Sequence, residues 1–97
     1  MHSINKRVTP VVDQIWKHTK TGNTYVITGV ALNTITDKLD VLYKDHLKEA
    51  EYSRFSRQIS GHAKAFLSDN EDGSPRFILI ALNPLDYMER LEKGELK

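Results

Sequence analysis

Short apolar runs alternate with polar, turn-forming stretches along the chain, a pattern typical of a small β-rich domain. The clearest run covers residues 24–32, where β-branched and aromatic residues predict a central strand. Gly29 within this run removes a side chain and indicates a bulge or a close backbone approach. Residues 33–38 are polar and turn-competent, and residues 39–43 resume the apolar pattern, which predicts a β-hairpin.

Two further segments complete the expected sheet. Residues 11–18 predict a strand that enters a turn at residues 20–23, because Gly and Asn in this turn tolerate positive φ. These strands form a three-stranded meander. The continuous apolar run at residues 76–82 follows the turn pair Asp72-Gly73 and predicts a buried strand. We therefore predict a mainly β (α+β) fold, with a bent sheet of about five strands.

Helical signals are found in two places. Apolar residues recur at helical spacing in residues 60–67 and predict a short helix, although Gly61 lies among them at a cost of about 1 kcal/mol. Asn83 as the N-cap and Pro84 at the first position predict a C-terminal helix over residues 84–93. Residues 45–53 are mostly polar and fit an exposed loop or a short surface helix.

The predicted C-terminal helix carries an apolar stripe. Leu85, Met88 and Leu91 recur at i, i+3 and i+6 and therefore share one face. That face can cover one side of the sheet or bind a second copy of the chain, which makes a homo-oligomer one of the expected assemblies.

Length and composition fit one domain. A chain of 97 residues buries one core, which we place in residues 11–82, followed by the helix at 84–93. Fourteen basic and thirteen acidic residues give a net charge of +1, far from the strongly basic balance of a DNA-coating protein. Non-specific nucleic-acid binding is therefore not favoured.

The sequence lacks cysteine and lacks long apolar segments, and both features bear on where the protein is located in the cell. The chain has no cysteine, which excludes disulfides and thiolate metal ligands and fits a reducing cytosol. No run approaches the ~18 apolar residues of a membrane span, and the start of the chain lacks the apolar stretch of a signal peptide. We expect a cytoplasmic protein without a membrane partner.

No motif of catalysis or metal binding is present in the sequence. The four histidines are too far apart in the chain for the short spacings that place imidazoles on one metal. The acidic turn near Asp72 fails as a calcium loop, because Ser68 and Leu79 stand where the anchoring carboxylates belong. Neither a nucleophile elbow nor a phosphate-binding Walker loop occurs. We predict a protein that is not an enzyme and needs no cofactor.

Aromatic and basic residues lie next to one another at several positions. Rings stack on bases or apolar ligands, while guanidinium groups pair with phosphate or carboxylate. This combination suits a nucleotide, a nucleic acid or an acidic peptide. The alternative is that the rings belong to the core and the cations form its solvated rim. The candidate ligand-binding residues are Trp16, His18, Tyr43, Lys44, Arg57 and Arg76.

A set of motifs in a fixed order runs through residues 15–80. They are Trp16-Lys17-His18, Gly22-Asn23, Tyr25-Val26-Ile27, Gly29-Val30-Ala31, Leu39, Val41, Tyr43-Lys44, Phe55, Arg57, Phe66 and Pro75-Arg76-Phe77. This order resembles domain-of-unknown-function family 1653, which comprises short bacterial and phage proteins. The resemblance implies a small SH3-like, strongly bent sheet or partial barrel. It implies no activity, since that family is uncharacterised.

Two functions remain open from the sequence. The first is a non-catalytic binding module that takes a nucleotide, nucleic acid or other anionic ligand on its aromatic and basic face. The second is a protein-interaction factor, phage-encoded and directed at a host protein, that uses the stripe of Leu85, Met88 and Leu91 or a sheet edge.

Overall fold

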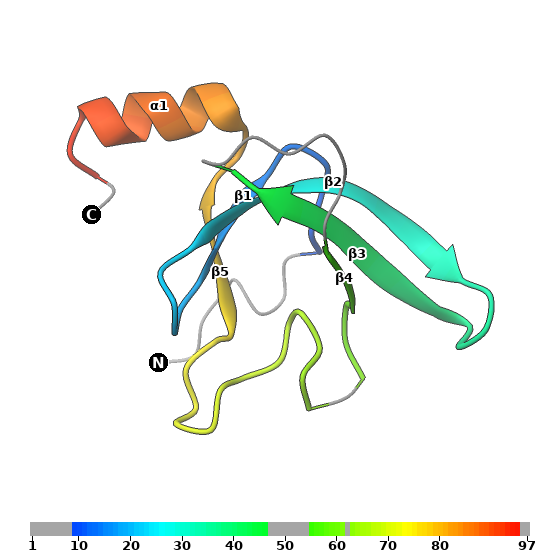
Figure 1. The fold of residues 1–97 in the computed structure, drawn as a ribbon. Helices are drawn as coiled ribbons and strands as arrows, with labels where there is room; N and C mark the ends of the chain where they lie inside the picture. The colour runs from blue at the N-terminus through cyan, green and yellow to red at the C-terminus, as the bar shows by residue number, and fades with distance from the viewer. Residues whose placement is uncertain (1–8, 47–54, 62, 96–97) are drawn as a thin grey trace.

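Five strands form one open antiparallel sheet, and a helix follows them, in the computed structural model, which describes residues 9–46, 55–61 and 63–95 (Figure 1). The strand order is β4-β3-β2-β1-β5, so β2 is central. This architecture confirms the predicted mainly β fold with one C-terminal helix. The elements are β1 (Ile15–His18), β2 (Thr24–Asn33), β3 (Lys38–Asp45), β4 (Phe55–Gln58), β5 (Phe77–Ala81) and α1 (Pro84–Glu92).

The β2–β3 hairpin is the longest pairing of the sheet and projects from it (Figure 1). Its register shifts between Ile27 and Gly29, which confirms the predicted bulge. The turn is held by Asn33, whose side-chain oxygen accepts from the backbone N–H of Ile35 at 2.9 Å. Asp37 closes the turn at a φ of 61°, and its N–H donates to the Asn33 carbonyl. The polar linker therefore makes the hairpin expected from its composition.

Strand β1 is shorter than predicted, because it begins at Ile15 and not at residue 11. A turn precedes it, closed by a bond from Gln14 N–H to the Val11 carbonyl at 3.1 Å. Asp13 in this turn has a φ of 79°, which a continuous strand does not allow. The Gln14 side chain fixes the turn by accepting from Val11 N–H at 2.9 Å and from Trp16 Nε1 at 3.1 Å.

The helix predicted over residues 60–67 is wrong. The described residues of this segment form turns, and Gly61 takes a φ of 99° that a helix does not permit. Phe66 N–H donates to the Gln58 carbonyl and Leu67 N–H to the Ile59 carbonyl, so the chain turns back and pairs with the end of β4. The helical spacing of apolar residues therefore marks burial in the core without a helix.

The same segment also reaches the start of β5. Ser68 accepts at its carbonyl from Arg76 N–H at 3.0 Å. Between these residues the chain turns at residues 69–74, where Asn70 N–H donates to the Ser74 carbonyl at 2.7 Å, as the predicted acidic turn requires. Backbone hydrogen bonds thus run from the β4 end of the sheet across residues 66–68 to the β5 end, while the strands themselves form an open sheet.

The main core lies on one side of the sheet, here called the inner face. Strand alternation places every second residue there. Trp16 and Phe66 are fully buried in it. The buried cluster consists of Trp16, Ile27, Val41, Tyr43, Ile59, Phe66 and Phe77.

The opposite side, here called the outer face, carries helix α1. Its small core consists of Ile15, Ala81 and Tyr87, and Tyr87 is the buried residue of the helix. Strand β5 is an edge strand, so the prediction that all of residues 76–82 are buried is wrong. Phe77 and Ala81 at its ends are buried, whereas residues 78–80 between them are half-buried.

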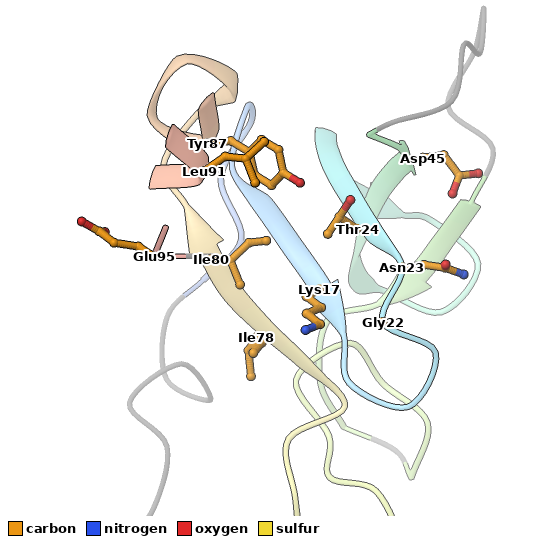
Figure 2. Close-up of a pocket in the computed structure, with 10 residues that line it drawn as sticks. All are labelled: Lys17, Gly22, Asn23, Thr24, Asp45, Ile78, Ile80, Tyr87, Leu91 and Glu95. Atoms are coloured by element: carbon orange, nitrogen blue, oxygen red, sulfur yellow. The ribbon is translucent and has the colours of Figure 1, made fainter. Parts of the chain in front are cut away.

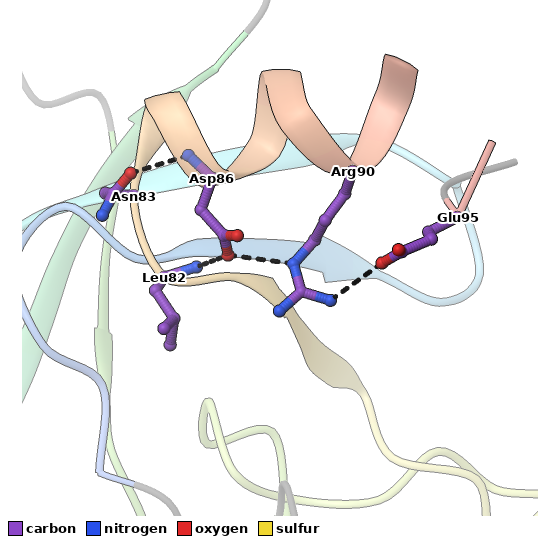
Figure 3. Close-up of polar contacts among 5 residues, drawn as sticks. All are labelled: Leu82, Asn83, Asp86, Arg90 and Glu95. Atoms are coloured by element: carbon purple, nitrogen blue, oxygen red, sulfur yellow. Dashed lines mark hydrogen bonds and ion pairs between the residues drawn. The ribbon is translucent and has the colours of Figure 1, made fainter. Parts of the chain in front are cut away.

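Helix α1 begins as the sequence predicts and ends one residue earlier, at Glu92. The Asn83 side chain caps it by accepting from Asp86 N–H at 2.8 Å (Figure 3). Asp86 accepts from Leu82 N–H at 2.8 Å and pairs with Arg90 at 2.9 Å. In the described part of the chain, no helix combines the length and hydrophobicity needed to cross a membrane.

Strand β3 extends to Asp45, the first residue of the predicted polar loop or surface helix. Most of that prediction, at residues 47–53, lies outside the described residues.

Candidate functional site

Trp16 belongs to the core. Its side chain is fully buried, its Nε1 donates to Gln14 Oε1 at 3.1 Å, and its ring meets Phe66 edge-on at 5.1 Å. A ring with no exposed surface offers no face for stacking on a ligand. Of the two interpretations left open by the sequence, the core interpretation applies to Trp16 and to the ring of Tyr43, which is 4% exposed and belongs to the same buried cluster.

Lys44 lies on the outer face, away from its neighbour Tyr43. Successive strand residues point to opposite faces, so adjacency in sequence separates these two side chains. The register shows this directly: Lys44 pairs with Val26 on the outer face, while Tyr43 pairs with Phe55 on the inner face. The aromatic and basic pair predicted here is therefore not one surface.

The other four predicted residues converge at one end of the inner face, around the ring of Phe77. His18 meets this ring edge-on at 4.9 Å, and Tyr43 does so at 5.8 Å. The Arg57 guanidinium lies over the same ring at 5.5 Å and its Nε donates to Tyr43 Oη at 3.2 Å. Burial lowers the pKa of the His18 imidazole, and Arg76 lies close enough for its charge to lower that pKa further. We call His18, Tyr43, Arg57, Arg76 and Phe77 the inner cluster.

Both guanidinium groups of the inner cluster are held by the segment that was predicted to be helical. Arg57 Nη1 donates to the Lys64 carbonyl at 2.6 Å. Arg76 donates through Nε to Ser68 Oγ at 3.0 Å and through Nη2 to the Ala63 carbonyl at 3.5 Å. The two groups therefore contact the carbonyls of adjacent residues in spite of their separation in the chain.

The pKa of His18 is lowered by burial and, in part, by the two arginines of the inner cluster. Burial lowers the pKa of His18 first, and the positive charges of Arg57, Arg76 and Lys20 lower it further. Among the described residues, no carboxylate pairs with either arginine of the inner cluster. The two arginines therefore place positive charge beside aromatic rings without an ion pair among the described residues.

Each strand of the sheet contributes a ring to this end of the inner face. Phe55 stacks on Tyr43 with ring centroids 5.3 Å apart and an interplanar angle of 26°. Tyr25 meets both of these rings edge-on, and it also meets Phe77 at 6.2 Å. Phe55 remains 41% exposed, so the row of rings ends in an accessible face beside Arg57. Sequence adjacency gave no reason to single out Tyr25; the cross-strand register does.

A hollow of about 470 Å³ opens beside the inner cluster at Arg76. It connects the arginine to solvent and holds more basic than acidic side chains. Its lining residues are Lys20, Ala63, Lys64, Asp69, Asn70, Glu71 and Arg76.

The apolar stripe of α1 is largely exposed. Leu85 is 79% exposed, Met88 52% and Leu91 46%. The helix docks on the sheet through Tyr87, whose ring meets His46 edge-on at 4.5 Å. The prediction that the stripe covers one face of the sheet is therefore wrong for most of the stripe, because its three side chains are about half exposed or more.

Metal-ligating residues do not gather in the described parts of the chain: no group of three or more His, Asp or Glu side chains there is placed to hold an ion. Comparisons with protein-family models, with curated proteins and with solved structures find no match to this chain. The resemblance to domain-of-unknown-function family 1653 and the SH3-like description that it implies stay predictions, and the inner cluster has to be interpreted from its own geometry.

Proposed function

We propose that this protein is a non-catalytic binding module whose inner cluster takes a nucleotide. The observation that carries the proposal is the convergence of two arginines and a histidine, distant in sequence, on one set of aromatic rings. Such a site offers positive charge for phosphate, and Phe55 at 41% exposure offers a ring face for a base.

The arginines supply the phosphate-binding chemistry. A guanidinium carries five N–H donors in a planar fork. The bonds of Arg57 to Tyr43 and Lys64, and those of Arg76 to Ser68 and Ala63, use only some of these donors and fix the orientation of each plane. The remaining donors are available to phosphate oxygens, and little conformational entropy is lost on binding because the groups are already ordered.

The rings supply the second part of the site. Phe55 is the most exposed ring of the row and is backed by Tyr43 and Tyr25. A base stacked on Phe55 lies on the same strand face as Arg57, two residues along β4. Phosphate and ring recognition by neighbouring groups favours a nucleotide over an acidic peptide. The net charge of +1 favours a small ligand over a long nucleic acid.

A titration with ADP followed by calorimetry tests this proposal, with adenosine and pyrophosphate as partial ligands. We expect ADP to bind more tightly than either part. Arg76→Gln is expected to weaken ADP binding by about tenfold or more, since a hydrogen bond to a charged group contributes about 1.5–3 kcal/mol. Arg57→Gln provides an independent second variant with the same expectation.

Lys44→Gln is the matched control, because it removes one positive charge from the outer face of the same sheet. Equal losses in Lys44→Gln and Arg76→Gln would show a general charge effect and contradict the site. Binding of an eight-nucleotide single strand without binding of ADP would assign the cluster to nucleic acid instead.

A second candidate function is favoured by the exposure of the α1 stripe. Leu85, Met88 and Leu91 together present an apolar face without cover among the described residues, as a protein-interaction surface does. Self-association through this face predicts a dimer in sedimentation velocity that dissociates in the double variant Leu85→Ser, Met88→Ser. A wild-type chain that stays monomeric at high concentration contradicts self-association and leaves a heterologous protein as the partner in this second candidate.

A further inference from the structure

A groove separates helix α1 from the outer face of the sheet, on the side opposite the inner cluster. It has a volume of about 350 Å³, at the lower end of the range for small-molecule sites. Strands β1, β2 and β5 form its floor and α1 forms one wall (Figure 2). The lining residues are Lys17, Gly22, Asn23, Thr24, Asp45, Ile78, Ile80, Tyr87, Leu91 and Glu95.

One part of the groove is apolar. Ile80 of β5 faces Tyr87 and Leu91 of α1 across it (Figure 2). Ile78 extends this surface along the strand, and the residues on the sheet side are half-buried. The apolar part is therefore preformed and open enough to take an aliphatic or aromatic body.

The other part of the groove is polar, and Lys17 is the one cation among the described residues that line it. Lys17 on β1 is the cross-strand partner of Thr24 on one side and of Ile78 on the other, so its side chain stands between a hydroxyl and an apolar surface. No carboxylate pairs with Lys17 in the described part of the chain. The acidic side chains of Asp45 and Glu95 lie at opposite ends of the groove and point away from Lys17 (Figure 2).

Thr24 adds an independent observation. Its Oγ1 is shielded from solvent and has no hydrogen-bond partner among the described residues. A buried hydroxyl without a partner is rare and costs free energy, so it marks a place where a further polar atom belongs. Thr24 lines the groove and is the cross-strand partner of Lys17.

We propose that this groove binds a small amphipathic monocarboxylate. The carboxylate pairs with the Lys17 ammonium and accepts from Thr24 Oγ1, and the apolar body lies against Ile80, Tyr87 and Leu91. The acidic residues at both ends of the groove disfavour polyanions. This site is thus separate from the inner cluster in position and in the chemistry of its ligand.

Octanoate is a suitable probe, with octylamine and octan-1-ol as matched molecules that differ in the head group. In ¹H–¹⁵N spectra of the full chain, octanoate is expected to shift the signals of Lys17, Thr24 and Ile80 in a saturable manner. Octan-1-ol is expected to bind more weakly than octanoate, and octylamine more weakly still. Prior saturation with ADP leaves the octanoate shifts in place, because the two sites are on opposite faces.

Lys17→Met keeps an unbranched side chain of similar shape without the ammonium group, and Lys38→Met at the hairpin is the control. We expect Lys17→Met to weaken octanoate binding about tenfold, the usual effect of losing a charge-assisted hydrogen bond of about 1.5 kcal/mol. Lys38→Met leaves the affinity unchanged. The proposal is overturned by absent or scattered shifts, by equal affinity for octylamine, or by an unaltered affinity in Lys17→Met.

Discussion

His18 is the residue at which burial, charge and ring packing meet. Its imidazole is half-buried against Phe77, and Arg57 and Arg76 lie close enough to disfavour its protonation. His46 on the outer face is different, because burial alone lowers its pKa. The pKa of His18 therefore reports on the inner face and the pKa of His46 on the outer face. Burial lowers both pKa values, and of the two only the pKa of His18 is lowered further by Arg57 and Arg76.

Stability is expected to fall as the medium becomes acidic, beginning near the ordinary histidine pKa of about 6.5. Because the folded-state pKa values of His18 and His46 are lowered, the unfolded chain binds these protons more readily. The free energy of unfolding therefore decreases as pH drops through that value and levels off below the lowered pKa values. Urea unfolding between pH 7.5 and 5 measures this.

The variant His18→Gln is the control for this prediction. It removes the contribution of His18 and leaves that of His46, so its stability should depend less steeply on pH over the same range. The carboxyl groups with lowered pKa values, Asp72 and Asp86, act at a lower pH and do not disturb the comparison. An identical pH dependence in both proteins would contradict the environment assigned to His18.

At the scale of the elements, helix α1 depends on its first turn. Asn83 caps the helix, and the Asp86 carboxylate links Leu82 to Arg90 (Figure 3). Tyr87 is the one residue of the helix that is buried, so tertiary contacts give the helix limited support. Local capping therefore contributes a larger share of its stability than in a helix packed along its whole length.

Asn83→Ala is expected to destabilise the protein by about 0.5–2 kcal/mol, the usual cost of losing an N-cap side chain. Far-UV circular dichroism should show reduced helicity, and urea unfolding gives the free energy. Asn23→Ala serves as the control, because Asn23 is an exposed residue of the β1–β2 turn and caps no helix. Equal effects of the two substitutions would contradict the capping role.

Local sequence patterns predicted those elements whose backbone is determined locally. The bulge at Gly29, the hairpin after it and the cap at Asn83 each follow from residues close together in the chain. The helix expected at residues 60–67 does not form. Phe66 is buried because its ring stacks on Phe77 of strand β5, with ring centroids 4.1 Å apart, and this contact is distant in the chain. A helical spacing of apolar residues carries no information on that partner.

The site was predictable only in part, for a related reason. Tyr43 and Lys44 are neighbours in sequence, yet strand alternation sends them to opposite faces. Trp16 has the largest ring in the chain, and this ring is fully buried in the core. The convergence of Arg57 with Arg76 depends on the return of residues 63–68 between β4 and β5, which no motif in either segment signals.

At the scale of the whole molecule, the single sheet separates two chemistries. The inner face combines a core with an arginine-rich cluster at one end, and the outer face combines helix α1 with a groove that holds one lysine. The near-zero net charge conceals this arrangement, because Arg57 and Arg76 lie together at the inner cluster while many of the acidic residues lie in turns and on helix α1. Ligands of the two faces are therefore expected to bind independently.

The central claim is that the inner cluster binds a nucleotide, and the pKa of His18 tests it most directly. NMR titration of the imidazole signals is carried out with and without saturating ADP. A phosphate held beside His18 stabilises the imidazolium, so its pKa should rise when ADP is present, while the pKa of His46 stays unchanged. An unchanged His18 pKa, or an equal rise at His46, would contradict the assignment of the site.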